Sequence, residues 1–148
     1  MRREILFKAK RKDNGEWVEG CLIIDCVSGQ YFIHQNGNSV NESPKIREEG
    51  YLRFFAFEID PNTICQYTGL TDKNGRKIWE NDIVSFLDTT STENGYSECF
   101  CVGVISWDST TASFQVSNRM MAESYEVLDE WGTIIGNIFD NADLLEVE

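Results

Sequence analysis

Short apolar runs separated by polar turn segments dominate the pattern along this chain. Residues 5–9 and 17–24 are rich in apolar side chains, and the Asp-Asn-Gly sequence at 13–15 between them tolerates positive φ. We therefore expect an opening β-hairpin. A turn signal at 28–30 precedes a third apolar run, so we expect a short strand at 31–33.

The next part of the chain is polar before it becomes strongly aromatic. From residue 34 to residue 50 we expect a loop, which ends in one helical turn capped by Ser43 and started by Pro44. Residues 51–59 carry aromatic side chains on both faces. That pattern is typical of a strand that is covered on each side.

The stretch Pro61–Val84 is the part around which the rest of the sequence is organised. A strand is predicted at 63–67, followed by a bend at 68–70. A tight turn centred on Asn74 and Gly75 then leads to a short return strand.

Two aspartates in this stretch have a structural role that needs no catalytic function. Asp72 is placed to accept hydrogen bonds from turn amides, and Asp82 is placed to cap the next chain reversal. The stretch is thus interpreted as a structural hinge between two β subregions. If it also binds a partner, we expect the contact surface to include an exposed face of Tyr67, Thr68 and Trp79.

The C-terminal half continues the strand-and-turn pattern. We expect a strand at 83–86, a polar loop at 88–98, and a hairpin in which 99–107 alternates and 113–116 returns. Further along we predict a short helix, two closing strands and a final turn, located respectively at 118–123, at 125–128 and 133–139, and after Asn141.

These segments predict an all-β fold, mainly β with one or two short helices, arranged as a small barrel or a sandwich. The 18 aromatic residues (4 Trp, 5 Tyr and 9 Phe) favour pleated, half-buried surfaces over helices. A length of 148 residues suits a single domain, 1–148. Within it, two β subregions at about 1–60 and 61–148 are an alternative organisation.

The net charge of −12 is distributed unevenly. Residues 1–85 hold 12 Lys and Arg against 13 Asp and Glu, whereas residues 86–148 hold 1 against 12, so the last part carries −11. A field of this sign repels phosphate and disfavours direct nucleic-acid binding, except through the N-terminal region. It also suits head-to-tail self-association, contact with a basic partner protein, or simply a solubilising surface.

The sequence predicts a cytoplasmic protein. We find no signal peptide and no run near the ~20 apolar residues of a membrane span. The five cysteines form an odd set that suits reduced thiols better than a disulfide framework.

Known catalytic and metal-binding patterns are largely missing from the sequence. His34 is the single histidine, and a pair with Cys65 has no support from spacing. Cys99 and Cys101 share a strand face without further zinc ligands, and the segment from Asp72 departs from the spacing of a calcium loop. We therefore expect no cofactor and no metal.

One enzymatic alternative is kept open. Glu80 and Asp82 lie on one face if their segment is extended, and with Asp72 they could support acid–base hydrolysis. More often such carboxylates are solvated or cap turns.

Three segments of the central stretch carry a family resemblance. Gln66–Leu70 (QYTGL), Asp72–Gly75 (DKNG) and Ile78–Val84 (IWENDIV) resemble the signature of the YopX family of phage and prophage proteins. Trp79 stands where the family has Tyr, and Asn81 stands where it has Gly; Asn, like Gly, tolerates positive φ.

Both ends of the chain agree with this resemblance. Ile5–Ala9 with Trp17–Val18 is similar to the opening strand pair of the family, and Ile135–Asn141 with Leu144–Leu145 is similar to its closing segment. The resemblance implies a mostly β, oligomeric protein encoded by phage or prophage of mainly Gram-positive bacteria. It transfers no catalytic residue.

These observations favour a non-enzymatic accessory protein of the bacterial cytoplasm that acts by binding and assembles as a homo-oligomer. As candidate contact residues we name Tyr67, Thr68, Trp79, Asp72 and Asp82. The alternative is an acidic mimic of nucleic acid that inhibits a basic protein. Neutralising Asp129, Glu130, Asp140 and Asp143 would then weaken the complex.

Overall fold

The computed structural model describes residues 3–35, 56–92, 95–118, 125–127 and 129–145, with backbone alone at 88–92, 96–99 and 125. The chain groups into two compact units, Met1–Tyr67 and Thr68–Glu148. The expected helical turn at Ser43 and the expected helix at 118–123 lie outside the described residues. That the chain forms one domain stays a prediction.

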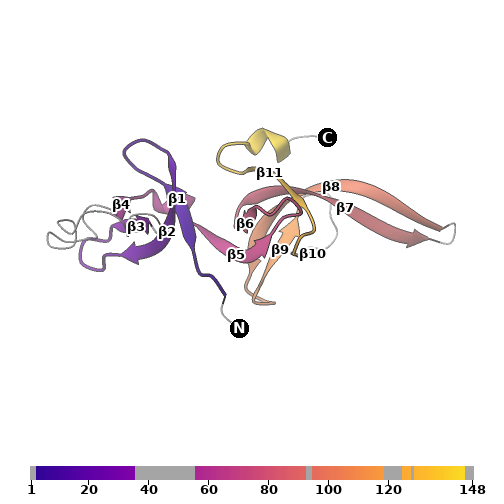
Figure 1. Ribbon diagram of the computed structural model, residues 1–148, viewed down its shortest axis with the longest axis horizontal. Helices are drawn as coiled ribbons and strands as arrows, with labels where there is room; N and C mark the ends of the chain where they lie inside the picture. The colour runs from indigo at the N-terminus through magenta and orange to yellow at the C-terminus, as the bar shows by residue number, and fades with distance from the viewer. Residues whose placement is uncertain (1–2, 36–55, 93–94, 119–124, 128, 146–148) are drawn as a thin grey trace. The chain divides into compact units, whose positions relative to one another are not determined.

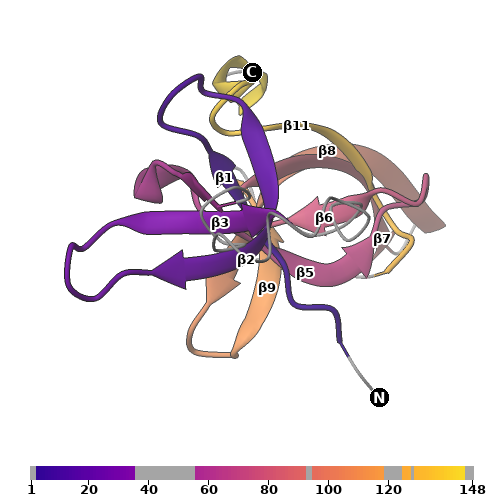
Figure 2. The ribbon, with the colours of Figure 1, turned by 60° about the vertical axis from the view of Figure 1, so that its left-hand side comes forward.

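The first unit is built on antiparallel strands (Figure 1). The strands are β1 (Phe7–Lys10), β2 (Trp17–Ile24), β3 (Tyr31–Gln35) and β4 (Ala56–Glu58), followed by a 3-10 turn, η2 (Pro61–Thr63). Strand β1 pairs with β2 and β2 with β3, each antiparallel. Figure 2 shows β2 and β3 side by side. The predicted opening hairpin and third strand are confirmed.

The core of the first unit follows from strand alternation. Ala9, Val18, Ile33 and Ile59 are buried in one cluster, against which partly buried residues such as Phe57 pack. Ala9 and Val18 face each other in the β1–β2 register, so their side chains share one face of the sheet. Burying these groups stabilises the unit by removing apolar surface from water.

A close approach between β2 and β3 requires a glycine. A Cβ atom added at Gly20 would lie 2.0 Å from the backbone carbonyl oxygen of His34. Nothing else in the β2 sequence marks this position, because the clash comes from the neighbouring strand.

Strand β5 (Cys65–Thr71) crosses the boundary between the two units. Its first residues pair with β1, and β6 (Lys77–Trp79) follows it in the strand order β4-β3-β2-β1-β5-β6. The predicted bend at 68–70 is wrong. Strand β5 continues to Thr71. Within it, the hydroxyl of Thr68 donates a hydrogen bond to the carbonyl of Ile78 on the neighbouring strand β6 at 2.8 Å.

The second unit holds a five-stranded antiparallel sheet in the order β10-β9-β8-β7-β11. The strands and the closing 3-10 turn are β7 (Asp82–Thr92), β8 (Gly95–Asp108), β9 (Ser113–Ser117), β10 (Tyr125–Glu126), β11 (Thr133–Asn137) and η3 (Ala142–Leu145). Its core cluster is formed by Ile78, Val84, Phe86, Ile105, Val116 and Val127. The hairpin predicted from 99–107 and 113–116 is confirmed as β8 and β9.

The polar segment at 88–98 was expected to be a loop, and this expectation is wrong. Strands β7 and β8 stay paired from Ile83–Val104 outward to Thr92–Gly95. Three of the five residues at 88–92 are Thr, which has high β propensity, and each of the five gains a cross-strand partner, so the hairpin lengthens instead of opening.

The all-β prediction is confirmed. In the described residues the strands form two antiparallel sheets rather than one closed barrel, and the helical segments are single 3-10 turns. No helix in the described part of the chain is long and apolar enough to cross a membrane.

Candidate interaction site

The turn between β5 and β6 is organised by one buried carboxylate. Asp72 is 0% exposed. Its Oδ1 accepts hydrogen bonds from the backbone N–H groups of Asn74 and Arg76, each at 2.9 Å, and its Oδ2 accepts one from Ile134 at 3.1 Å. Asp72 therefore holds the turn closed and ties it to β11.

The surroundings of Asp72 keep it ionised. Burial raises the pKa of its carboxyl, but the three N–H donors from Ile134, Arg76 and Asn74, with the positive charge of Arg76, outweigh burial and hold the pKa below its usual value. The Nε of Arg76 lies 3.4 Å from Oδ2. The buried charge is thus both paired and hydrogen-bonded, as burial requires.

Arg76 completes the attachment to β11. Its guanidinium donates a hydrogen bond to the carbonyl of Ile134, whose N–H is bound by Asp72. Both backbone polar groups of Ile134 therefore bond to side chains of the β5–β6 turn. This residue also adjoins a register shift in the β11–β7 pairing, which lies between Ile134 and Gly136.

A second chain reversal lies between β6 and β7. The Oδ2 of Asp82 accepts a hydrogen bond from the backbone N–H of Trp79 at 2.8 Å. Asn81 has φ of 72°, its N–H donates to the carbonyl of Ile105 at 2.8 Å, and its carbonyl accepts from the N–H of Ile138 at 3.1 Å. Position 81 thus needs a residue that tolerates the left-handed conformation.

The five residues named from sequence as contact candidates are all buried. Their exposed fractions are 8% for Tyr67 and Thr68, 4% for Trp79, 0% for Asp72 and 3% for Asp82. The prediction of an exposed face formed by Tyr67, Thr68 and Trp79 is wrong, because all three side chains are buried. The reason is packing: Tyr67 and Thr68 are consecutive on β5, so their side chains point to opposite faces, and both faces of the strand are covered there. A binding role for these residues stays a prediction.

The hydrolase alternative depended on Asp72, Asp82 and Glu80, of which Glu80 is half-buried. Both oxygens of Asp72 are engaged by backbone N–H groups of turn and strand, and Asp82 closes a turn. In the described residues, no group of three or more His, Cys, Asp or Glu side chains could hold a metal ion.

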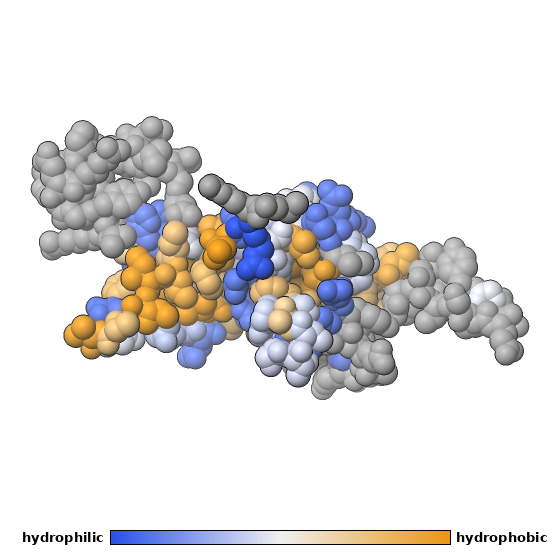
Figure 3. All heavy atoms as spheres, turned by 90° about the horizontal axis from the view of Figure 1, so that it is seen from below, coloured by the Kyte–Doolittle hydropathy of each residue, from blue (hydrophilic) through white to orange (hydrophobic). Residues whose placement is uncertain are grey.

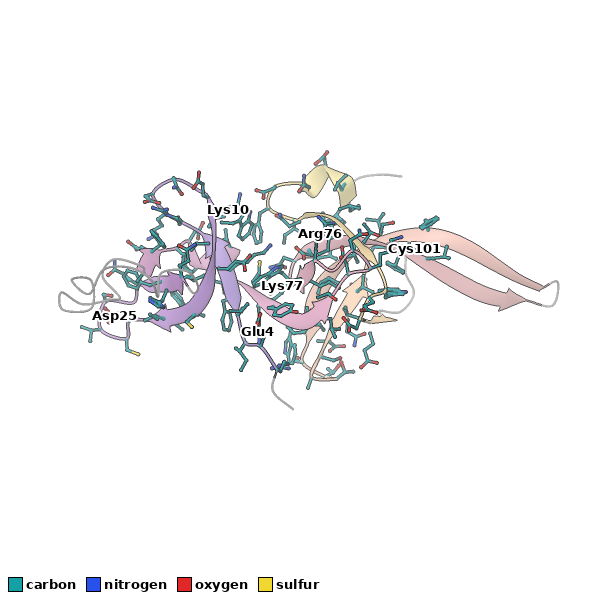
Figure 4. All side chains as sticks on the ribbon, in the orientation of Figure 1. Glu4, Lys10, Asp25, Arg76, Lys77 and Cys101 are labelled. Carbon is teal, nitrogen blue, oxygen red and sulfur yellow. The ribbon has the colours of Figure 1, made fainter. Side chains whose placement is uncertain are left out.

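The first unit contains a hollow that is lined by none of the candidate residues named above. It has a volume of about 550 Å³ and is lined by residues before β1, by β2 and by the end of β3. Trp17 lies in its wall, with the ammonium groups of Lys8 and Lys10 at 4.8 and 5.5 Å from the centroid of its ring. Figure 4 labels Lys10. Lysines two apart opposite a Trp in a predicted hairpin are the signal that could have indicated this cluster.

The outer part of the β7–β8 hairpin forms an arm, which we define as residues 86–92 and 95–101. Among the described residues, β11 pairs with β7 only at Asp82–Ser85, and β9 pairs with β8 only at Val104–Asp108. Beyond these positions β7 and β8 pair with each other over seven residue pairs, from Phe86–Cys101 to Thr92–Gly95. The arm is about 20 Å long at ~3.3 Å per residue. It is drawn as the long ribbon of the second unit in Figure 1.

The base of the arm has one buried and one exposed face. Phe86 is 2% exposed and packs on Trp131, with ring centroids 4.6 Å apart. Leu87 and Phe100, which are paired directly across the strands, are 38% and 74% exposed. Adjacent large apolar side chains at the surface of a two-stranded ribbon indicate an interaction surface, because such a ribbon is marginally stable alone.

Apolar side chains also reach the surface of the first unit. Val27 in the β2–β3 turn is 98% exposed and Ile24 at the end of β2 is 52% exposed. Figure 3 shows apolar residues at the surface of this unit in orange. These residues provide a comparison for the arm, since they occupy a hairpin end and not an extended ribbon.

The fold and the two turns define a class of all-β proteins in which a central double turn, held by buried aspartates, links two antiparallel sheets. A family model described as YopX protein matches residues 6–146, and the chain belongs to the YopX family. No curated protein shows significant similarity to it.

Proposed function

We propose that this protein acts by binding and self-assembly rather than by catalysis, as an accessory protein of phage or prophage in the cytoplasm of the bacterial host. The observation that carries the proposal is the arm, with Leu87 and Phe100 exposed side by side. The chain belongs to the YopX family, and the phage or prophage setting is what the resemblance to that family implies.

The arm suits assembly for two physical reasons. An extended two-stranded ribbon presents backbone N–H and C=O groups along its outer edges, which another chain can pair with. Covering Leu87 and Phe100 removes apolar surface from water, at roughly 25 cal/mol per Å². Both gains are available only when a partner covers the ribbon.

Light scattering after size exclusion tests the self-assembly. At micromolar concentration we expect a mass that is a multiple of the 17.0 kDa chain. The double variant Leu87→Ser with Phe100→Ser is expected to elute as a monomer with unchanged circular dichroism. Ile24→Ser with Val27→Ser, which removes exposed apolar surface from the first unit, is the matched control and should assemble normally. A wild-type protein that is strictly monomeric would remove self-assembly from the proposal.

A second candidate function is acidic mimicry of nucleic acid toward a basic host or phage protein. The observation that favours it is charge: residues 68–148 contain 4 Lys and Arg against 15 Asp and Glu, a net charge of −11. No Lys or Arg occurs between Lys77 and Arg119. Such a surface attracts a basic partner and repels phosphate.

Exposed carboxylates test this candidate. Glu130, Asp140 and Asp143 are exposed, and Asp140 accepts a hydrogen bond from the side-chain amide of Asn137 at 3.2 Å. Asp129 accepts a hydrogen bond from the backbone N–H of Thr71 at 2.9 Å, which joins two distant segments, so it is left unchanged. A complex formed by mimicry should weaken steeply with salt and on replacing Glu130, Asp140 and Asp143 by amides. A salt-indifferent complex would contradict it.

A further inference from the structure

A thiol and an imidazole face each other on the first sheet. In the β2–β3 register Cys21 lies directly opposite His34. Directly opposed residues of an antiparallel pair place their side chains on the same face, with Cβ atoms about 4.5–5.5 Å apart. The neighbouring residue Ile33 belongs to the buried core cluster, so by alternation the two side chains lie on the other face of the sheet. The single histidine of the chain is therefore within reach of a thiol.

The backbone fixes this arrangement. Next to Cys21, the approach of β2 to β3 is so close that a Cβ atom at Gly20 would lie 2.0 Å from the carbonyl oxygen of His34. The Nε2 atom of His34 is shielded from solvent, so the ring packs against the protein and has fewer orientations than a fully solvated ring. The imidazole is thus held beside Cys21 by the sheet itself.

Small molecules have access to Cys21. Its side chain is exposed, although it lies within a strand. The adjoining residue pair, Gly20 and Gln35, lines the hollow described above, so a small group attached to Cys21 has open space beside the strands.

The imidazole distinguishes Cys21 from the other exposed thiol of this unit. The thiolate is the reactive form of cysteine, and a neighbouring base that accepts the thiol proton produces it. Cys26 is also exposed, but it lies in the β2–β3 turn, beyond the pairing of Ile24 with Tyr31. Because the chain has one histidine, which is opposite Cys21, Cys26 has no such base beside it.

The charged groups of this face largely offset one another. Glu19, two residues before Cys21, is exposed and repels a thiolate, but Lys8 lies directly opposite Glu19 in the β1–β2 register and attracts one. On β4 the carboxylate of Glu58 accepts a hydrogen bond from the ammonium of Lys12 at 3.1 Å. The imidazole is therefore the neighbour that sets Cys21 apart.

We propose that Cys21 is a site of reversible covalent modification by small disulfides, with His34 as the base that takes up its proton. The thiolate of Cys21 attacks one sulfur of a disulfide R–S–S–R, so that a bond forms between Cys21 and that sulfur and the original S–S bond breaks. The proton held by the imidazole passes to the departing thiolate, which leaves as R–SH. An excess of thiol reverses the step, and the inference does not depend on self-assembly.

Timed labelling with bis(2-hydroxyethyl) disulfide tests the reactivity of Cys21. This probe is uncharged, so Glu19 and Lys8 do not alter its approach. Cleavage before Asp25 places Cys21 and Cys26 in separate peptides for mass spectrometry. At pH 7 we expect modification of Cys21 to be roughly tenfold faster than that of Cys26, and reversal by excess 2-mercaptoethanol. Equal rates, or faster modification of Cys26, would overturn the inference.

Replacing the imidazole tests the role of His34. In His34→Asn we expect the rate at Cys21 to fall roughly tenfold, to about that of Cys26, while the rate at Cys26 stays unchanged. The direction is decisive, because a variant that merely loosens the sheet would increase access to Cys21 and speed its modification. A rate at Cys21 that is unchanged or higher in a folded variant would show that His34 does not act as its base.

Cys65 reports on folding in the same experiment. It is 1% exposed and should stay unmodified in wild type and in His34→Asn. Modification of Cys65 in His34→Asn would mean that the unit has opened. His34→Gln then takes its place, and the rates at Cys21 and Cys26 decide by the same criteria.

Discussion

The carboxylate of Asp72 accepts a hydrogen bond at 3.1 Å from the backbone N–H of Ile134, 62 positions further along the chain. The same carboxylate accepts hydrogen bonds from two backbone N–H groups of its own turn. One side chain therefore both closes the β5–β6 turn and attaches it to the edge strand β11. Its burial is tolerable because each oxygen is hydrogen-bonded and Arg76 supplies a counter-charge.

Replacing Asp72 by Ala should destabilise the protein by about 3 kcal/mol, because three backbone donors and one guanidinium lose a buried charged acceptor. Urea denaturation at pH 7 measures the change. Asp143→Ala, which removes an exposed carboxylate, is the control and should change stability by less than about 0.5 kcal/mol. Equal effects from both substitutions would contradict the role given to Asp72.

The stability supplied by Asp72 should depend on pH in a defined direction. Its pKa in the folded state lies below the ordinary value, so its contribution is present above the unfolded pKa of about 3.9 and is lost as the pH falls through the folded pKa. The stability gap between wild type and Asp72→Asn should therefore be constant from pH 7 to about pH 5 and shrink at lower pH. Denaturation curves at each pH measure it. A gap that grows on acidification would reverse the sign of the argument.

At position 81 the backbone conformation, and not the side chain, should determine how much a substitution changes stability. Asn81 has φ of 72°, so Asn81→Ala should be less stable than Asn81→Gly by about 1 kcal/mol, although both variants lack the amide. Thermal unfolding of the two variants side by side gives the difference. Equal stabilities would show that the left-handed conformation is not maintained there.

Gly20 should tolerate no side chain. A Cβ atom would lie 2.0 Å from the carbonyl oxygen of His34, so Gly20→Ala must push β3 away from β2 and should cost more than about 3 kcal/mol. Gly15→Ala is the comparison, since that glycine has φ of 72° but open space around its Cβ position, and it should cost about 1 kcal/mol. Circular dichroism with denaturant titration compares the two, and a mild Gly20→Ala would refute the close contact.

Several elements could be predicted from local sequence alone. The opening hairpin, the third strand, the β8–β9 hairpin and the structural use of Asp72 and Asp82 all follow from alternation, turn residues and short-range hydrogen bonding. Asn81 was expected to tolerate the conformation that Gly would adopt, and its φ of 72° agrees. These features are decided by residues only a few positions apart, so the sequence carries them directly.

Other features depend on partners that are distant in the chain. The strand continues from Asp88 to Thr92 because β8 pairs with it, and β5 runs through Thr68–Leu70 because β6 lies beside it. The local sequence alone predicts a loop at 88–98 and a bend at 68–70. Backbone groups that find a neighbouring strand gain hydrogen bonds that the local sequence does not show.

The candidate interaction surface shows the same division. Composition already indicated an acidic C-terminal half and an all-β chain, because charge and β-branched or aromatic content are sums over residues. Burial is decided by tertiary packing. It placed Tyr67, Thr68 and Trp79 inside, left Leu87 and Phe100 outside, and brought Arg76 beside Ile134, since which face of a strand is covered depends on elements far away in the sequence.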